Sequence, residues 1–157
     1  MRFFIYLFWA YLYPVTPHDP YSDQSFLTYS FLICFQMFAL FFLNELLWYW
    51  VHRAEHQWSA VWRASGHGAH HAFQKLGALN FGLNHPLEYF FLLLPGALLE
   101  LTFGIGAATL GASLLLITQA SIAHCNVATN SRLIGWVFTT NQYHICHHSS
   151  PIFHSHP

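Results

Sequence analysis

The sequence predicts an all-helical (all-α) protein: an integral membrane helical bundle with a cytosolic, histidine-rich helical cap. Three observations predict this class. Of the 157 residues, 55% are hydrophobic and only 7% are charged, whereas a soluble domain usually carries about 25% charged residues. Long apolar segments alternate with short polar ones. Histidine occurs 13 times, against five Lys and Arg residues, and gathers in the polar segments.

The first long apolar segment covers residues 26–43. As a helix it would span about 27 Å at about 1.5 Å per residue, close to the thickness of a bilayer core. It continues through the aromatic stretch "NELLWYW", which is typical of the lipid headgroup level, and then into "VHRAEH". We therefore expect one helix to carry His52 and His56 just outside the hydrocarbon.

The second apolar segment, residues 87–123, is too long for a single span. Gly104 and Gly106 interrupt it, and glycine both weakens a helix and permits a tight turn. The sequence therefore predicts a helical hairpin, with one helix over residues 87–103 and a second over residues 107–123.

The two feet of this hairpin, His85 and His124, must lie on one face of the membrane. Residues 53–86 connect the first span to the hairpin, and their basic residues and histidines make a membrane crossing costly. All the histidine clusters are then expected on one side of a multi-pass protein. Four of the five basic residues share that side, which the positive-inside bias makes cytoplasmic; they are Arg53, Arg63, Lys75 and Arg132.

The opening residues 2–13 are hydrophobic but too short to span a bilayer. A shortened first helix, a re-entrant piece and an interfacial anchor all remain open for them. The cysteines form neither a CxxC motif nor an even-numbered set, so we interpret them as packing residues rather than as disulfide or thiolate zinc sites. The net charge of −1 argues against a nucleic-acid partner, which would call for a basic surface.

Three histidine clusters fall on the predicted cap: "HRAEH", "HGAHH" and "HICHH". In a helix, residues three and four apart share a face, so each cluster is expected to direct two or three imidazoles the same way, as metal ligands require. His124 adds a further candidate. Nine imidazoles exceed the three or four that zinc sites use, so two metals that share the nine imidazoles are the simplest explanation. Imidazole suits Zn, Cu, Fe and Ni alike, and spacing alone does not choose among them.

Other readings of these histidines fit less well. "HRAEH" is not the HExxH motif of zinc peptidases, because Arg53 stands where that motif has glutamate. We interpret His18 and His85 as surface or hydrogen-bonded residues, and His154 and His156 as a solvated tail. No GxSxG, P-loop or GxGxxG motif occurs.

The motifs "ELLWYWVHRAEH", "VWRASGHGAHH", "NHPLE", "AHCNV" and "HICHHS" follow the order and spacing of the fatty acid hydroxylase and sterol desaturase superfamily. The resemblance covers residues 45–148. It implies a membrane enzyme in which two irons under a histidine cap use O2 and two electrons to hydroxylate or desaturate a lipid C–H bond, with zinc as an alternative occupant in isolated protein. The implied ligands are His52, His56, His67, His70, His71, His124, His144, His147 and His148.

The resemblance also implies roles for residues around the metals. Glu45 is expected to orient a ligand imidazole, with an interfacial acid bonded to a neighbouring helix as the alternative, and Asn126 is expected to hydrogen-bond near the metal. Glu88 and Glu100 are interpreted as interfacial acids. Implied partners are a lipid substrate, the membrane, and a separate electron donor that is cytochrome b5-, ferredoxin- or reductase-like.

The chain departs from the family pattern at Asn84 and Asn141. Relatives usually continue beyond the last cluster, so we expect residues 1–157 to form a single fatty acid hydroxylase-like domain that is truncated at its C-terminus or lacks part of the cap. Hydroxylation is favoured over desaturation by analogy with short members. A membrane metal-binding or metal-handling protein without redox turnover is the alternative function.

Overall fold

The computed structural model describes residues 25–73, 75–104, 106–127, 132 and 134–149. Over these residues the protein is all-helical and contains no strand. The opening residues 2–13 lie outside the described residues, as do His18, His154 and His156.

One long helix, α2 (Phe26–Gln57), crosses the whole molecule. It begins where the Ser25 hydroxyl accepts a hydrogen bond from the Thr28 backbone N–H at 3.3 Å, and it ends at Trp58, whose backbone is extended. Its 32 residues would measure about 48 Å, which exceeds the roughly 30 Å of a bilayer core. As expected, the helix is long enough both to span a bilayer and to extend beyond it with His52 and His56.

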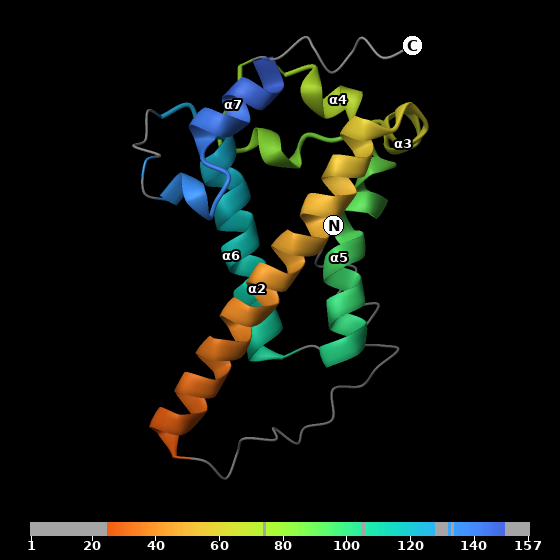
Figure 1. Ribbon diagram of the computed structural model, residues 1–157. Coiled ribbons are helices and arrows are strands. Elements are labelled where there is room, and N and C mark those ends of the chain that lie inside the picture. The colour runs from red at the N-terminus through yellow and green to blue at the C-terminus, as the bar shows by residue number, and fades with distance from the viewer. Residues whose placement is uncertain (1–24, 74, 105, 128–131, 133, 150–157) are drawn as a thin grey trace.

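The predicted hairpin is present as helices α5 (Glu88–Phe103) and α6 (Ala107–His124). They are joined at the end opposite the histidines, and α2 crosses between them (Figure 1). The chain leaves α5 at Gly104 with φ of 79°, a conformation that costs glycine little and most other residues more. Pro95 lies inside α5 and is buried.

Small residues let α6 pack closely against α2. Ala108 and Ala112 are buried, and a Cβ added at Gly111 would lie only 2.6 Å from Sδ of Met37 on α2. Close backbone approach through small residues is the usual way in which helices associate within a membrane.

Large apolar side chains cover the outer surfaces of these helices. Phe31 of α2 is 70% exposed, Phe90 of α5 is 75% exposed and Leu114 of α6 is 66% exposed. Both α2 and α6 are long and apolar enough to cross a membrane. Soluble proteins rarely leave such continuous apolar surface open to water, so these faces are suited to contact with lipid.

Short helices close the opposite end of the bundle and, with the last turns of α2 and α6 and the first turn of α5, form what we call the cap (top of Figure 1). The largest side chains that are almost fully enclosed in the protein are mainly polar ones in this cap, among them His67, Glu55, Glu88 and Asn141. The short cap elements are α3 (Ser59–Ser65), α4 (Gly68–His71), η1 (Asn80–Gly82) and α7 (Asn141–Ser149), whereas η2 (Ile134–Trp136) lies beside α6, below α7 in Figure 1.

Candidate metal centre

All nine histidines that the sequence singled out lie in the cap, where four helices bring them together. The last two turns of α2, the short helix α4 with the residue before it, the last residue of α6, and α7 each contribute. Clusters that are far apart in the sequence therefore face one another across the end of the bundle. Their ring nitrogens form two separate groups.

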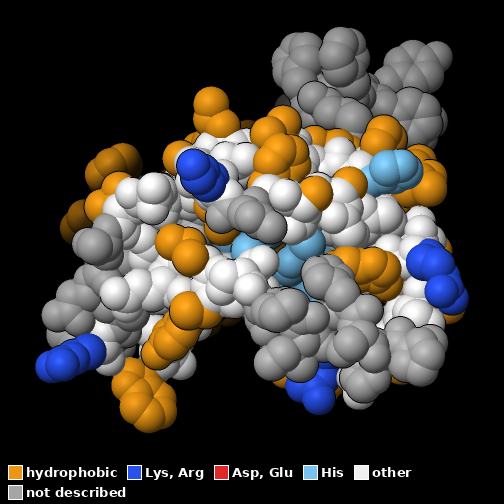
Figure 2. All heavy atoms as spheres, turned by 90° about the horizontal axis from the view of Figure 1, so that it is seen from above, with side chains coloured by type: hydrophobic (Ala, Val, Ile, Leu, Met, Phe, Trp, Pro, Cys, Tyr) orange, Lys and Arg blue, Asp and Glu red, His pale blue; other side chains and the backbone are white. Residues whose placement is uncertain are grey.

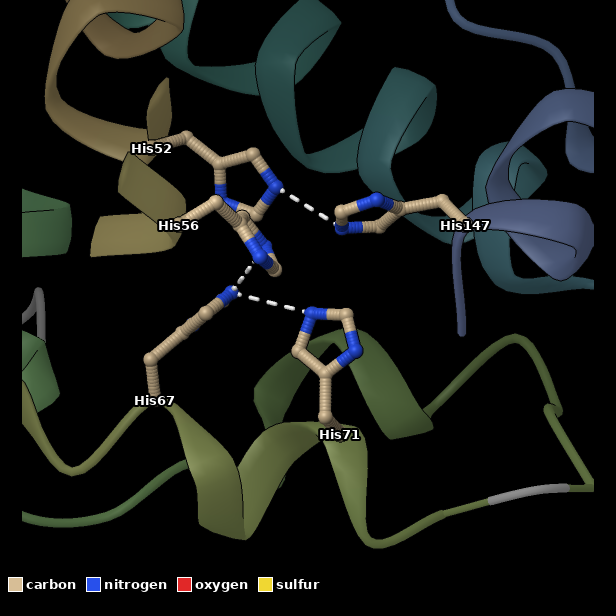
Figure 3. A group of neighbouring side chains, drawn as sticks. All are labelled: His52, His56, His67, His71 and His147. Atoms are coloured by element: carbon tan, nitrogen blue, oxygen red, sulfur yellow. Dashed lines mark hydrogen bonds between the residues drawn. The ribbon is translucent and has the colours of Figure 1, made fainter. Parts of the chain in front are cut away.

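The first set, called the five-histidine group, combines residues from α2, α7 and the region of α4 (Figure 3). Its ligand atoms all lie within 4.8 Å of one another, close to the spacing of about 4 Å or less that atoms on one metal show. Nε2 of His67 lies 3.1 Å from Nε2 of His56 and 3.1 Å from Nε2 of His71. The members are His52, His56, His67, His71 and His147.

The second set, called the four-histidine group, combines residues from α4, α6 and α7. Nε2 of His124 lies 3.2 Å from Nε2 of His70 and 2.9 Å from Nε2 of His144, and His144 in turn lies 3.1 Å from His148. His70 and His124 are buried at 5% and 6% exposure. These four ligand atoms also lie within 4.8 Å of one another.

The two groups adjoin each other. The rings of His71 and His148, one from each group, stack with centroids 4.3 Å apart and planes 15° apart. Metals held in the two groups would therefore be neighbours, as a centre with two metals requires.

The sequence expectation that each cluster points one way is correct only for pairs spaced by four residues. His67 and His71 share the five-histidine group, whereas His70 between them joins the four-histidine group. In the last cluster His144 and His148 stay together and His147 joins the other group. On these helices the i,i+4 spacing keeps two rings on one face, while the member at i+3 turns toward the neighbouring group.

The hydrogen-bonding capacity of imidazole fits metal binding at these positions. A neutral imidazole has one N–H and one lone pair. Nδ1 of His124 donates to the Ala120 carbonyl at 2.7 Å, so its Nε2 is a lone pair, and that lone pair faces two further Nε2 atoms. Where several ring nitrogens converge, there are fewer N–H protons than contacts between nitrogens. A cation shared by their lone pairs therefore satisfies them better than hydrogen bonds among the rings do.

Burial keeps these imidazoles in the neutral form that binds metal. Burial, followed by the nearby His124, lowers the pKa of His70 to about 4, against the opposing effect of a backbone hydrogen bond at Leu83. Burial and then His70 lower the pKa of His148 to about 3. The pKa values of His67, His71 and His144 are lowered further still, by burial first and by neighbouring histidines second.

Two carboxylates lie against the five-histidine group, and sequence reasoning missed both. Glu88, which the sequence suggests is an interfacial acid, is enclosed in the protein: it is 1% exposed, and its Oε1 forms a hydrogen bond with Nδ1 of His67 at 2.6 Å. Glu55, with 0% exposure, has Oε2 3.6 Å from Nδ1 of His52 and 3.7 Å from Nδ1 of His67. The one available signal for Glu55 is its position in "HRAEH", three residues after His52.

Asn141 is a further cap residue whose role the sequence did not indicate. Its side chain is 1% exposed, and its Nδ2 donates to the carbonyl of Cys125 at 3.3 Å and to the carbonyl of Val127. The start of α7 is thereby tied to the segment that directly follows His124. This contact sets the position of the α7 histidines relative to His124.

Glu45 and Asn126 lie farther from the histidines. Glu45 is half-buried on α2, seven residues or about 10 Å along the axis from His52. Asn126 is exposed just beyond α6. Their proposed roles near the metals stay predictions. His85 packs against Gly66 and accepts a hydrogen bond at Nδ1 from the Leu87 backbone N–H, as expected for a structural histidine.

Comparisons with known proteins point in the same direction as this geometry. The family model described as fatty acid hydroxylase matches residues 37–155. The chain is 30% identical to the ornithine lipid hydroxylase OlsE of Rhizobium tropici over 125 residues, which cover 74% of this chain and 35% of that protein. The chain thus spans about a third of the length of this curated relative. No solved structure matches.

Proposed function

Because the chain belongs to the fatty acid hydroxylase family, we propose that its cap holds two irons and that the protein uses O2 to hydroxylate a lipid. The observation that carries this proposal is the pair of adjoining groups of buried, converging imidazoles at the end of an apolar helical bundle. The overall reaction converts C–H, O2, two electrons and two protons into C–OH and water.

The residues present fit two such metals. The five-histidine group would hold one through His52, His56, His67, His71 and His147, and the four-histidine group the other through His70, His124, His144 and His148. Bound iron would supply the activation of O2 that C–H hydroxylation needs, since imidazole ligand sets suit iron. The protein keeps these ligands neutral by burial and holds them in place from four helices.

A lipid substrate is supported by the apolar surface beside the cap. α2 and α6, which carry His52, His56 and His124 at their ends, expose large apolar side chains along their length. An acyl chain held against these helices would reach the cap without leaving an apolar surface, so that its C–H bond, rather than water, approaches the metals.

The cap side carries the positive charge, which supports a cytoplasmic location and a separate acidic electron donor. Figure 2 views the molecule from that side and shows Lys and Arg at its edges and histidine in its middle, with no Asp or Glu of the described residues in view. Within the described residues no acid is classed as exposed, whereas four bases are: Arg53, Arg63, Lys75 and Arg132. Positive residues favour the cytoplasmic side of membrane proteins and attract an acidic partner.

The experiment is a lipid comparison. Membranes from cells that express the full chain, together with a redox partner, are extracted and analysed by mass spectrometry for lipids that have gained one oxygen atom. The His147→Ala, His148→Ala double variant removes one ligand from each group, and the exposed Gln142→Ala on the same helix is the control. We expect oxygenated lipid with the wild type and Gln142→Ala only. Stoichiometric metal in the wild type without any oxygenated lipid would contradict the proposal and favour a metal-binding protein without redox turnover.

A further inference from the structure

Glu88 makes the closest contact between a carboxylate and a candidate metal ligand in the described part of the chain. Its Oε1 lies 2.6 Å from Nδ1 of His67, and both side chains are 1% exposed. Burial raises the pKa of Glu88 to about 8, so the direction of this hydrogen bond follows from the ring of His67. A metal bound at Nε2 would leave the single proton of the ring on Nδ1, and this N–H would donate to Oε1 of Glu88. The lone pair of His67 Nε2 then points toward Nε2 of His56 and of His71, each 3.1 Å away.

The neighbouring acid, Glu55, does not make an equivalent bond to His67. Its Oε2 is 3.7 Å from Nδ1 of His67, which is beyond hydrogen-bond distance. The orientation of the His67 ring is therefore set by Glu88.

Local packing holds Glu88 in this position. Gly66, directly before His67, has φ of 74°, and a Cβ there would lie 2.6 Å from Cγ of His85. The Glu88 backbone N–H donates to the His85 carbonyl at 2.9 Å, and the His67 backbone N–H donates to Ser65 Oγ at 3.3 Å. The segments that carry His67 and Glu88 thus pack directly against each other.

The two histidine groups differ in what lies behind them. Behind the four-histidine group, His124 donates its Nδ1–H to the backbone carbonyl of Ala120, and His70 forms a hydrogen bond with the backbone of Leu83. The buried carboxylates Glu55 and Glu88 contact His52 and His67, which belong to the five-histidine group. A carboxylate that accepts from a ligand imidazole fixes its tautomer and raises its basicity.

We propose that Glu88 is a positioning residue that keeps the Nε2 lone pair of His67 directed into the five-histidine group, so that this group retains its metal longer than the four-histidine group does. The proposal rests on the proposed function in one respect, namely that both groups hold metal. It concerns the ligands alone and is independent of the lipid that is oxidised.

The test uses the full chain, purified in detergent and loaded anaerobically with ferrous iron. Iron per chain and the release of iron to an excess of chelator are measured for the wild type, Glu88→Gln, Glu88→Leu and the control Glu100→Gln, which lies on the same helix near its other end. We expect two release phases in the wild type. In Glu88→Leu the slow phase should accelerate roughly 10- to 100-fold, because loss of a partner behind a metal ligand lowers metal affinity by about this factor and weaker binding is expected to appear as faster release. Glu88→Gln, whose amide oxygen still accepts, should fall between, and Glu100→Gln should match the wild type.

Wild-type release from both Glu88 variants, or equal acceleration of both phases, would overturn the proposal. If circular dichroism shows that Glu88→Leu has lost its helices, the slow phase of Glu88→Gln decides: faster release supports the proposal and unchanged release overturns it. A chain that binds metal but oxygenates no lipid overturns the proposed function alone. A wild-type chain that binds no metal overturns both.

Discussion

At the scale of single residues, Gly66 shows how a missing side chain shapes the cap. The residue ends α3 with φ of 74° and lies against the ring of His85. In Gly66→Ala the left-handed backbone alone should cost about 1–2 kcal/mol, and the new methyl group would also push His85 away. We expect a lower midpoint of thermal unfolding and faster loss of metal from the five-histidine group.

The matched control for this substitution is Gly82→Ala. An added Cβ at Gly82 meets nothing within 4 Å, and the residue has no positive φ. Its midpoint of unfolding should stay close to that of the wild type. Equal effects of the two substitutions would show that the contact between Gly66 and His85 is unimportant.

The pKa values of the buried histidines predict that the metal-free protein is sensitive to acid. Burial lowers the pKa of His70 to about 4 and that of His148 to about 3, whereas an unfolded histidine titrates near 6.5. Below that value the unfolded chain binds more protons than the folded chain, so stability falls as the pH falls. The loss should begin near pH 6.5 and continue to about pH 4 for His70 and about pH 3 for His148.

Thermal unfolding of the metal-free chain, followed by circular dichroism across this pH range, measures the effect. Glu55 and Glu88 act in the opposite direction, because burial raises their pKa values to about 7 and about 8, but the histidines with lowered pKa values outnumber them. The midpoint should therefore drop on acidification and recover when the pH is returned to neutral. A midpoint that does not change across the range would mean that these imidazoles are accessible to protons in the folded chain.

At the scale of elements, the placement of α7 depends on Asn141. Its amide donates to backbone carbonyls of Cys125 and Val127, and each such hydrogen bond contributes about 0.5–1.5 kcal/mol to stability. In Asn141→Ala the start of α7 should separate from the end of α6. His144 and His148 would then shift relative to His124, and the four-histidine group should lose its metal first.

Iron analysis of the purified variant tests this expectation. The neighbouring Gln142→Ala, which changes an exposed residue of the same helix, should retain the wild-type iron content. If Asn141→Ala and Gln142→Ala retain equal amounts of iron, the tie between α7 and the segment after His124 does not position the ligands.

The long apolar helices could be predicted from the sequence because their signal is local. Length and hydropathy over residues 26–43 and 87–123 suffice for helices and a hairpin, and Gly104 lies where the turn occurs. The nine histidines were also recognisable, since clustered imidazoles are rare in an apolar chain. Their division into two groups was not, because it depends on the rotation of short helices that only tertiary packing sets.

The environment of Glu88 shows which contacts a single sequence does not predict. Beside Pro86 and an apolar run, an acid is most simply interpreted as one at the start of a membrane helix. Its partner His67 is 21 residues away in the sequence, and they meet because Gly66 admits His85. A single sequence carries no record of this long-range contact.

At the scale of the whole molecule, the basic edge of the cap predicts how a donor protein docks. Arg63 and Lys75 are exposed on that face. The Arg63→Glu, Lys75→Glu double variant should slow electron delivery from an acidic donor and reduce its dependence on ionic strength. The charge-preserving Arg63→Lys, Lys75→Arg variant should behave as the wild type does. Lipid oxidation with a reconstituted donor at several salt concentrations measures this, and identical salt dependence in both variants would place the docking site elsewhere.

The measurement that tests the account most directly is iron per chain in the purified wild type, in His124→Ala, and in the His147→Ala, His148→Ala double variant. The account predicts one iron for each histidine group in the wild type, loss of one iron in His124→Ala because only the four-histidine group contains that residue, and a deficit in both groups in the double variant. An iron-free wild type, or an iron content that the three proteins share, would contradict the assignment of these histidines as ligands of two metals.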